Sequence, residues 1–165
     1  MDSRNIQTSA RWNRKVILIG LLILLFLGLV GAFLAVEPTR AASLTVTNNS
    51  DSGAGSLRQA IADANPGDTI TFAPQVSGTI TLTSGELVVN KSVTITGPGA
   101  ANLAISGNNA SRVVSITTSV NVTLSDMTIA NGRVTSGDGG GIYNTGTLTL
   151  TNAVVYSNTA SNLDA

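Results

Sequence analysis

Short segments that alternate apolar and polar residues run through most of this sequence, and a turn follows each of them. Gly, Asn, Ser or Pro stands in nearly every connection between the segments. A period of two is typical of β-strands with one buried face, so the sequence predicts an all-β fold of many short strands. The alternating pairs are Ile70/Phe72, Ile80/Leu82, Leu87/Val89, Val93/Ile95, Leu103/Ile105, Val114/Ile116, Val122/Leu124, Met127/Ile129 and Leu148/Leu150.

The last third of the chain contains an internal repeat. "VTLSDMTIANG" (122–132) matches "LTLTNAVVYSN" (148–158) at an offset of 26 residues, with apolar positions over apolar positions and Thr over Thr. Repeats of this length stack and bury their apolar faces against their neighbours, and a unit without a helix favours a parallel β-helix coil. We expect residues 67–165 to form about four coils, with Ile, Leu and Val stacked in columns.

The glycine-rich stretch "SGDGGG" (136–141) lies directly before the strongest alternation, "TLTLT" (147–151). Glycine adopts positive φ without a steric penalty. The sequence therefore predicts a tight corner at these glycines, after which the Thr-Leu strand returns to the coil below.

A short helix is predicted over residues 56–66, before the alternating segments. Ser56 is a suitable N-cap, Leu57, Ala60, Ile61 and Ala64 form one apolar stripe, and Asn65-Pro66-Gly67 ends the helix. Since the end of a coil stack exposes apolar residues and strand edges, we interpret this segment as a capping helix. Residues 37–55 are predicted to be a linker with a first strand. No similar cap follows the last repeat, so we expect the array to be truncated at its C-terminus.

The N-terminal region has the pattern of a membrane anchor or a signal peptide. A basic segment, 1–15, precedes 21 uncharged residues, 16–36, which as a helix span roughly 31 Å, about the thickness of a bilayer. "TRAAS" (39–43) offers a cleavage site after Ala41. The preceding basic residues predict a cytoplasmic N-terminus and export of the rest. The protein is thus expected to be membrane-anchored, or secreted if it is cleaved near Ala41.

Composition excludes several kinds of site. The chain has no Cys and no His, which removes disulfides, Cys nucleophiles, Ser-His-Asp triads and Cys/His zinc sites. From residue 42 onward there are four Lys and Arg against seven Asp and Glu, a net charge of −3. No nucleic-acid partner is therefore expected.

Two motifs resemble those of a known group of bacterial proteins. Gly55-Ser56-Leu57-Arg58-Gln59-Ala60 is similar to an N-terminal element named for its Cys-Ser-Leu-Arg-Glu-Ala string, with Gly for Cys and Gln for Glu. Gly140-Gly141-Ile142 and "VVYSNTA" (154–160) resemble the repeats of polymorphic outer-membrane proteins, with Val155 in place of Phe. The resemblance covers residues 43–160 and implies a right-handed parallel β-helix of the pectin-lyase-like superfamily. That superfamily includes adhesins, surface proteins and polysaccharide-degrading enzymes.

The sequence offers few candidates for catalysis. Hydrolysis of a glycoside needs two carboxylates, but the repeat places Asp126 beside Asn152. Lyase chemistry, as the resemblance implies it, needs a basic residue and acid-bound Ca²⁺. Arg112, Lys91 and Arg133 have no cluster of acids near them in sequence, and a lone Asp138 in its glycine-rich loop is a poor Ca²⁺ site. We predict no catalytic residues, no cofactor and no metal.

Other residue types have simpler interpretations. Tyr143 and Tyr156 could stack on a sugar, although one Tyr in each repeat is more typical of packing. Four Asn-x-Ser/Thr triplets are expected by chance in such a chain and would carry glycans only in a eukaryotic secretory pathway. They begin at Asn48, Asn90, Asn109 and Asn121.

These observations favour an exported cell-surface β-helix module that is structural, adhesive or glycan-binding. Its expected partners are extracellular glycans or other cell-surface proteins, with the membrane contacted through residues 16–36. The alternative is the N-terminal part of a polysaccharide lyase or glycoside hydrolase whose catalytic coils lie beyond residue 165. The residues leave the question of enzymatic activity open and favour a protein without it.

Overall fold

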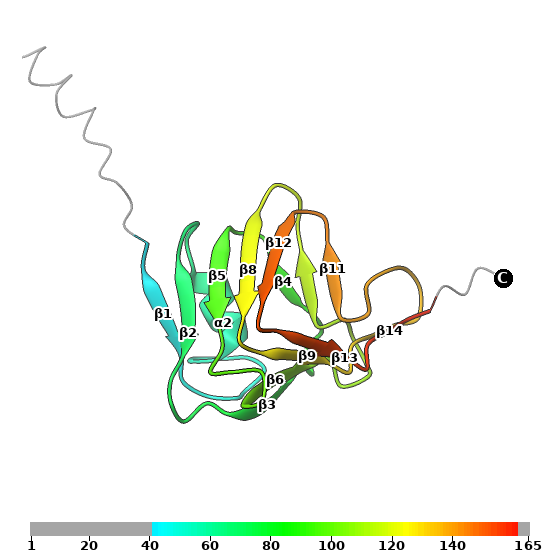
Figure 1. Ribbon diagram of the computed structural model, residues 1–165, viewed down its shortest axis with the longest axis horizontal. Coiled ribbons are helices and arrows are strands. Elements are labelled where there is room, and N and C mark those ends of the chain that lie inside the picture. The colour runs from blue at the N-terminus through cyan, green and yellow to red at the C-terminus, as the bar shows by residue number, and fades with distance from the viewer. Residues whose placement is uncertain (1–40, 162–165) are drawn as a thin grey trace, which may run out of the picture. The chain divides into compact units, whose positions relative to one another are not determined.

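The structure is a computed structural model that describes residues 41–161. In this part of the chain the backbone coils through about five turns as a parallel β-solenoid (Figure 1). Every strand pairing is parallel. The complete turns contribute one strand to each of three sheets, and these strands stack on those of the turns before and after.

The five-stranded sheet, here sheet A, contains β1 (Ser43–Val46), β2 (Thr69–Phe72), β5 (Val93–Thr96), β8 (Asn121–Ser125) and β12 (Thr147–Thr151) in this order. Sheet B contains β3 (Gly78–Thr81), β6 (Leu103–Ser106), β9 (Thr128–Ala130) and β13 (Val154–Tyr156), and sheet C contains β4 (Leu87–Val89), β7 (Val114–Ile116) and β11 (Ile142–Asn144). A small fourth sheet pairs β10 (Arg133–Val134) with β14 (Thr159–Ala160), and α2 (Leu57–Asp63) lies between β1 and β2.

Apolar side chains form continuous columns inside the solenoid, as predicted. One column in sheet A consists of Leu44, Ile70, Ile95, Leu124 and Leu150, each in register with the next. A column in sheet B consists of Ile80, Ile105, Ile129 and Val155. The interior members of both columns are almost completely buried. Within residues 41–161 the buried apolar residues form one core cluster, which runs from Val46 to Ile129.

The number of turns differs from the prediction. The sequence suggested about four coils from residue 67 onward, with residues 37–55 as a linker and first strand. In the structure β1 pairs with β2 over four residues, Ser43 to Val46, and thereby begins the stack one turn earlier. The helical segment Leu57–Asp63 separates this strand from β2 along the chain, so the alternation alone did not show that the two strands pair.

The predicted helix is present but lies after the first rung. Ser56 is its N-cap, and the Ser56 side chain accepts a hydrogen bond from the backbone N–H of Gln59. Leu57, Ala60 and Ile61 are buried against the core. Lys91, just past β4, donates from Nζ to the carbonyl oxygen of Ala62 at 2.6 Å. These contacts place α2 beside β4, the edge strand of sheet C, where a further strand of that sheet would otherwise lie.

In the last two turns, the corner between sheets A and B is made by a single residue with positive φ. Asp126 and Asn152 have φ values of 55° and 49° and stack 26 residues apart, with Asn152 Nδ2 donating to Asp126 Oδ1 at 3.2 Å. Asp and Asn tolerate this conformation better than most residues. The predicted pairing of these two residues and the predicted 26-residue register are both confirmed.

The prediction for "SGDGGG" was right only in part. Gly137 and Gly139 have positive φ values of 103° and 70°, whereas Gly140 and Gly141 do not. Gly140 is required for a different reason, because a Cβ there would lie 2.2 Å from the carbonyl oxygen of Thr159 in the next turn. In addition, β11 intervenes between these glycines and the Thr-Leu strand.

The predicted basic segment 1–15 and apolar segment 16–36 lie outside the described residues. Within residues 41–161, no helix has both the length and the apolar character needed to cross a bilayer.

Candidate functional site

The outer face of sheet A carries two parallel rows of hydroxyl side chains, called here the hydroxyl face. They alternate with the buried columns because successive side chains of a strand point to opposite faces. Within each row, neighbouring rungs are about 4.8 Å apart. One row contains Ser43, Thr69, Thr94, Thr123 and Thr149, and the other contains Thr45, Thr71, Thr96, Ser125 and Thr151.

The hydroxyl face is uncharged. No strand of sheet A contains Asp, Glu, Lys or Arg. Some of its hydroxyls have partners within the face, since Ser125 Oγ donates to Thr96 Oγ1 at 3.3 Å. Each hydroxyl can donate one hydrogen bond and accept two, so the rows keep capacity for a ligand. Thr methyl groups between the hydroxyls provide apolar contact.

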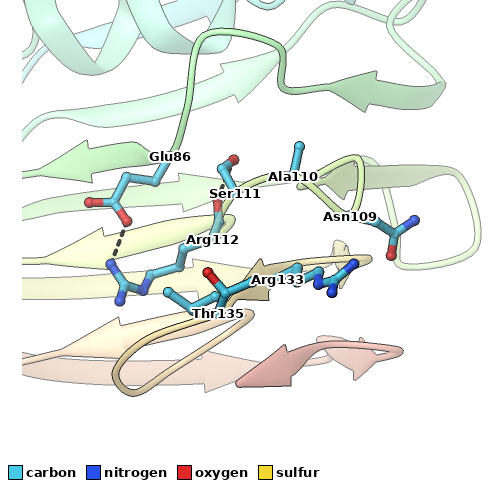
Figure 2. A pocket seen from close by; sticks show the side chains of 8 residues that line it. Glu86, Asn109, Ala110, Ser111, Arg112, Arg133 and Thr135 are labelled. Atoms are coloured by element: carbon cyan, nitrogen blue, oxygen red, sulfur yellow. Dashed lines mark hydrogen bonds and ion pairs between the residues drawn. The ribbon is translucent and has the colours of Figure 1, made fainter. Parts of the chain in front are cut away.

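A second feature is a groove of about 570 Å³ near the corner that precedes sheet C (Figure 2). Glu86, Arg112 and Ser111 form one part of its lining, and Arg133, Asn109 and Thr135 form another. Arg133 is exposed and, among residues 41–161, takes part in no ion pair. The groove could therefore accept a polar or anionic group through Arg133.

Arg112 is fully engaged in contacts within the protein. Its Nη1 atom forms an ion pair with Glu86 Oε2, Nε donates to the carbonyl of Gly139 at 2.7 Å, and Nη2 donates to the carbonyl of Asp138 at 2.8 Å. The guanidinium also lies over the ring of Tyr143, 4.8 Å from its centroid. Arg112 thus connects three successive turns and is not a free base for proton abstraction.

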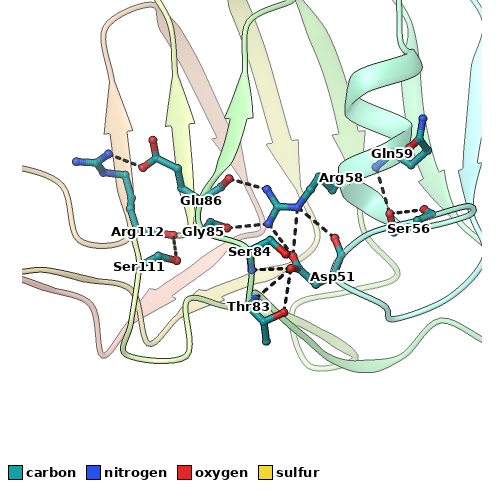
Figure 3. Close-up of polar contacts among 11 residues, drawn as sticks. Asp51, Ser56, Arg58, Gln59, Thr83, Ser84, Gly85, Glu86, Ser111 and Arg112 are labelled. Carbon is teal, nitrogen blue, oxygen red and sulfur yellow. Dashed lines mark hydrogen bonds and ion pairs between the residues drawn. The ribbon is translucent and has the colours of Figure 1, made fainter.

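Two rungs earlier, Arg58 makes a similar connection around Asp51 (Figure 3). Arg58 donates to Asp51 Oδ1 from Nη2 at 2.6 Å and to the carbonyls of Glu86 and Gly85 at 2.7 Å. Asp51 Oδ2 accepts from the backbone N–H groups of Thr83 and Ser84 at 3.2 and 2.7 Å. Burial acts to raise the pKa of Asp51, but hydrogen bonds from Ser84, Arg58 and Thr83 outweigh it and hold that pKa well below its usual range.

A second carboxylate, Asp68, joins the ends of the first turn. It accepts hydrogen bonds from the backbone N–H groups of Ala42 at 2.7 Å and Asn65 at 2.8 Å. The hydrogen bonds from Asn65 and Ala42 lower the pKa of Asp68. Both perturbed carboxylates therefore stabilise connections between turns, and neither faces a second acid across an open site.

The structure separates the other residues that the sequence singled out. Lys91 donates a hydrogen bond to a carbonyl oxygen of α2, and Asp126 accepts a hydrogen bond from Asn152 instead of facing another acid. Asp138 has an exposed side chain, and no group of three acidic residues gathers in the described part of the chain. Tyr143 lies on the outer face of sheet C under Arg112, whereas Tyr156 lies on the outer face of sheet B and is 51% exposed.

Asp51, Arg58 and Glu86 were not recognised as a connected set from the sequence. A signal was nevertheless present, because the 26-residue offset of the repeat also relates Glu86 to Arg112 and Arg112 to Asp138. Along the chain, no cluster of acids lies close to Arg112. In a solenoid the relevant neighbours are one turn away.

Replacing Arg112 by Lys is expected to loosen the loop that contains Asp138 and Gly139. Lysine keeps the positive charge but lacks the planar group that reaches both carbonyls and Glu86 together, so the free energy of unfolding should fall by about 1–2 kcal/mol. Amide hydrogen exchange of residues 135–141 measures the effect directly. The control is Arg133→Lys, which is expected to leave exchange unchanged, and equal exchange in both variants would contradict the assigned role.

Comparisons of the chain with protein-family models, with curated proteins and with solved structures found no match. The chain is therefore classified by its fold alone, as a parallel β-solenoid.

Proposed function

We propose that this chain is an exported cell-surface module that binds extracellular glycans through the hydroxyl face of sheet A. The observation that carries the proposal is the pair of regular, uncharged Thr and Ser rows on a five-stranded sheet. Glycans present hydroxyl groups and apolar ring faces, which complement hydroxyls and methyl groups at fixed spacing. A face that extends over five rungs also allows several sugar units to be contacted at once.

The contacts of the acidic residues support a binding role over a catalytic one. Asp51, Asp68 and Glu86 form hydrogen bonds or ion pairs that connect turns, and Asp126 bonds to Asn152. Glycoside hydrolysis needs two carboxyl groups that flank the same bond. We expect residues 41–165 to release from polygalacturonate neither new reducing ends, which hydrolysis would produce, nor ultraviolet-absorbing unsaturated products, which a lyase would produce. Turnover in either assay would favour the enzyme alternative.

The proposal includes export of the chain that follows segment 16–36. The basic residues before segment 16–36 favour translocation of everything that follows it. Reporter fusions after residue 165 are expected to be active only outside the cytoplasm, and cytoplasmic activity would contradict export.

The proposal also includes a right-handed coil. It is supported by the strong preference for right-handed connections between parallel strands.

Binding is tested by sedimentation of residues 41–165 with insoluble cellulose, chitin and peptidoglycan. Retention on at least one of these is expected. The double variant Thr94→Val and Thr123→Val removes two hydroxyls from the hydroxyl face while keeping side-chain shape, and should weaken binding at least about tenfold. The matched control is Thr79→Val with Thr81→Val on sheet B. No retention on any of the three, or equal loss in both double variants, would contradict the proposal.

A further inference from the structure

The solenoid does not require Thr or Ser at the outward positions of its strands. In sheet B, one row of outward residues on successive rungs consists of Thr79, Ala104, Thr128 and Val154. In sheet C, the corresponding row consists of Val88, Ser115 and Tyr143. Both rows of the hydroxyl face, by contrast, contain only Thr and Ser over five rungs. The uniform composition of sheet A is therefore not a requirement of the fold, and it points to a ligand.

The hydroxyl face is periodic in two directions, with its five strands side by side (Figure 1). Successive rungs are about 4.8 Å apart, and two outward residues of one strand, such as Thr94 and Thr96, are about 6.6 Å apart along it. β2, β5 and β8 each have a neighbouring strand on both sides, so this spacing does not depend on either end of the stack. Because Thr is branched at Cβ, its χ1 angle is restricted, and its hydroxyl and methyl groups have few alternative positions. The array is therefore well defined before any ligand binds.

Most hydroxyls of this face are free to bond outside the protein. Of both rows, the hydroxyls of Thr71, Thr96 and Ser125 take part in hydrogen bonds with other groups of residues 41–161. All three belong to one row, and the row from Ser43 to Thr149 takes part in none of these bonds. Each free hydroxyl can donate one hydrogen bond to water and accept two. Since the five strands also contain no ionic side chain to impose its own hydration shell, the face can hold water in a regular layer.

We propose that the hydroxyl face binds the surface of ice. Its two repeat distances are close to those between oxygen atoms on a prism face of ordinary ice, so hydroxyls of successive rungs can bond to successive waters of the lattice. The Thr methyl groups between them restrict the orientation of neighbouring water, which favours an ordered layer against the crystal. Ice binding uses the same face as the proposed glycan binding but does not depend on any affinity for glycans, and it goes beyond the proposed function.

Uptake of the protein into growing ice tests this inference. Ice is grown slowly on a cooled surface from a stirred solution of residues 41–165, which form one compact unit. Protein is then measured in the ice and in the remaining liquid. A protein that does not bind ice is pushed ahead of the growing crystal, whereas residues 41–165 are expected in the ice at a concentration close to that of the starting solution.

The double variant Thr94→Lys and Thr123→Lys places two long charged side chains in the middle of one row and is expected to be excluded from the ice. The matched control is Thr79→Lys with Thr81→Lys, which adds the same charge to the outer face of sheet B and should be taken up like the wild type. Because all four positions lie on outer faces, circular dichroism should show folded protein in both variants. Exclusion of the wild type, or equal uptake of the two double variants, would overturn the inference. Retention on a glycan without uptake into ice would also overturn it, while the proposed function would stand.

Discussion

Replacing Leu124 by Ala is expected to lower the free energy of unfolding of residues 41–165 by about 2–5 kcal/mol. Leu124 is 1% exposed and is in register with Ile95 on one side and Leu150 on the other. Ala would leave a cavity in the middle of the column that the rigid neighbouring rungs cannot fill. Urea denaturation followed by circular dichroism measures the loss.

The same column provides a matched control. Leu150 has the same side chain but is 43% exposed in β12, so Leu150→Ala should cost less than about 1 kcal/mol. Equal losses for Leu124→Ala and Leu150→Ala would mean that the column is not continuous.

Replacing Asp51 by Asn is expected to cost about 2–3 kcal/mol at neutral pH and to change how stability depends on pH. The Asp51 side chain is 8% exposed, and its loss of charge leaves Arg58 without its ionic partner. The pKa of Asp51 in the folded state lies below its ordinary value of 3.8. The stabilisation it provides is therefore present above about pH 4 and is lost as the pH falls below that value.

The wild-type chain should accordingly lose stability as the pH is lowered below about 4, and Asp51→Asn should show a shallower loss. Asp68, whose pKa is also lowered, retains its own contribution in the variant. Denaturant midpoints measured at each pH provide the data. The control is Asp138→Asn at an exposed position, which should follow the wild-type curve. An Asp51→Asn curve parallel to wild type would contradict the assigned pKa.

The solenoid could be predicted because its determinants are local and repeat. Alternation with a period of two fixed which residues face inward, and the 26-residue offset fixed the register of β8 with β12. The helix was predictable from the Ser56 cap and its apolar stripe. The position of the helix after the first rung was not predictable, because it depends on the pairing of β1 with residues 26 positions later in the chain.

The polar contacts were harder to predict because they depend on where loops of different turns lie. Arg58 reaches Gly85 and Glu86 across a helix and a complete turn, at separations of 27 and 28 residues. Turns of unequal length prevent a single offset from identifying such partners. The hydroxyl face, by contrast, follows from the same alternation that predicted the core, because Thr and Ser stand between the buried residues of the sheet A strands.

The stacking of rungs in parallel register is tested most directly by distances between spin labels along one row of the hydroxyl face. With one label at Ser43→Cys and a second at Thr94→Cys, Thr123→Cys or Thr149→Cys, the pairs span successive rungs of sheet A. Samples diluted with unlabelled protein exclude distances between copies. Each further rung should add about 4.8 Å to the separation measured by electron paramagnetic resonance. Separations that do not increase in this order would contradict the parallel β-solenoid.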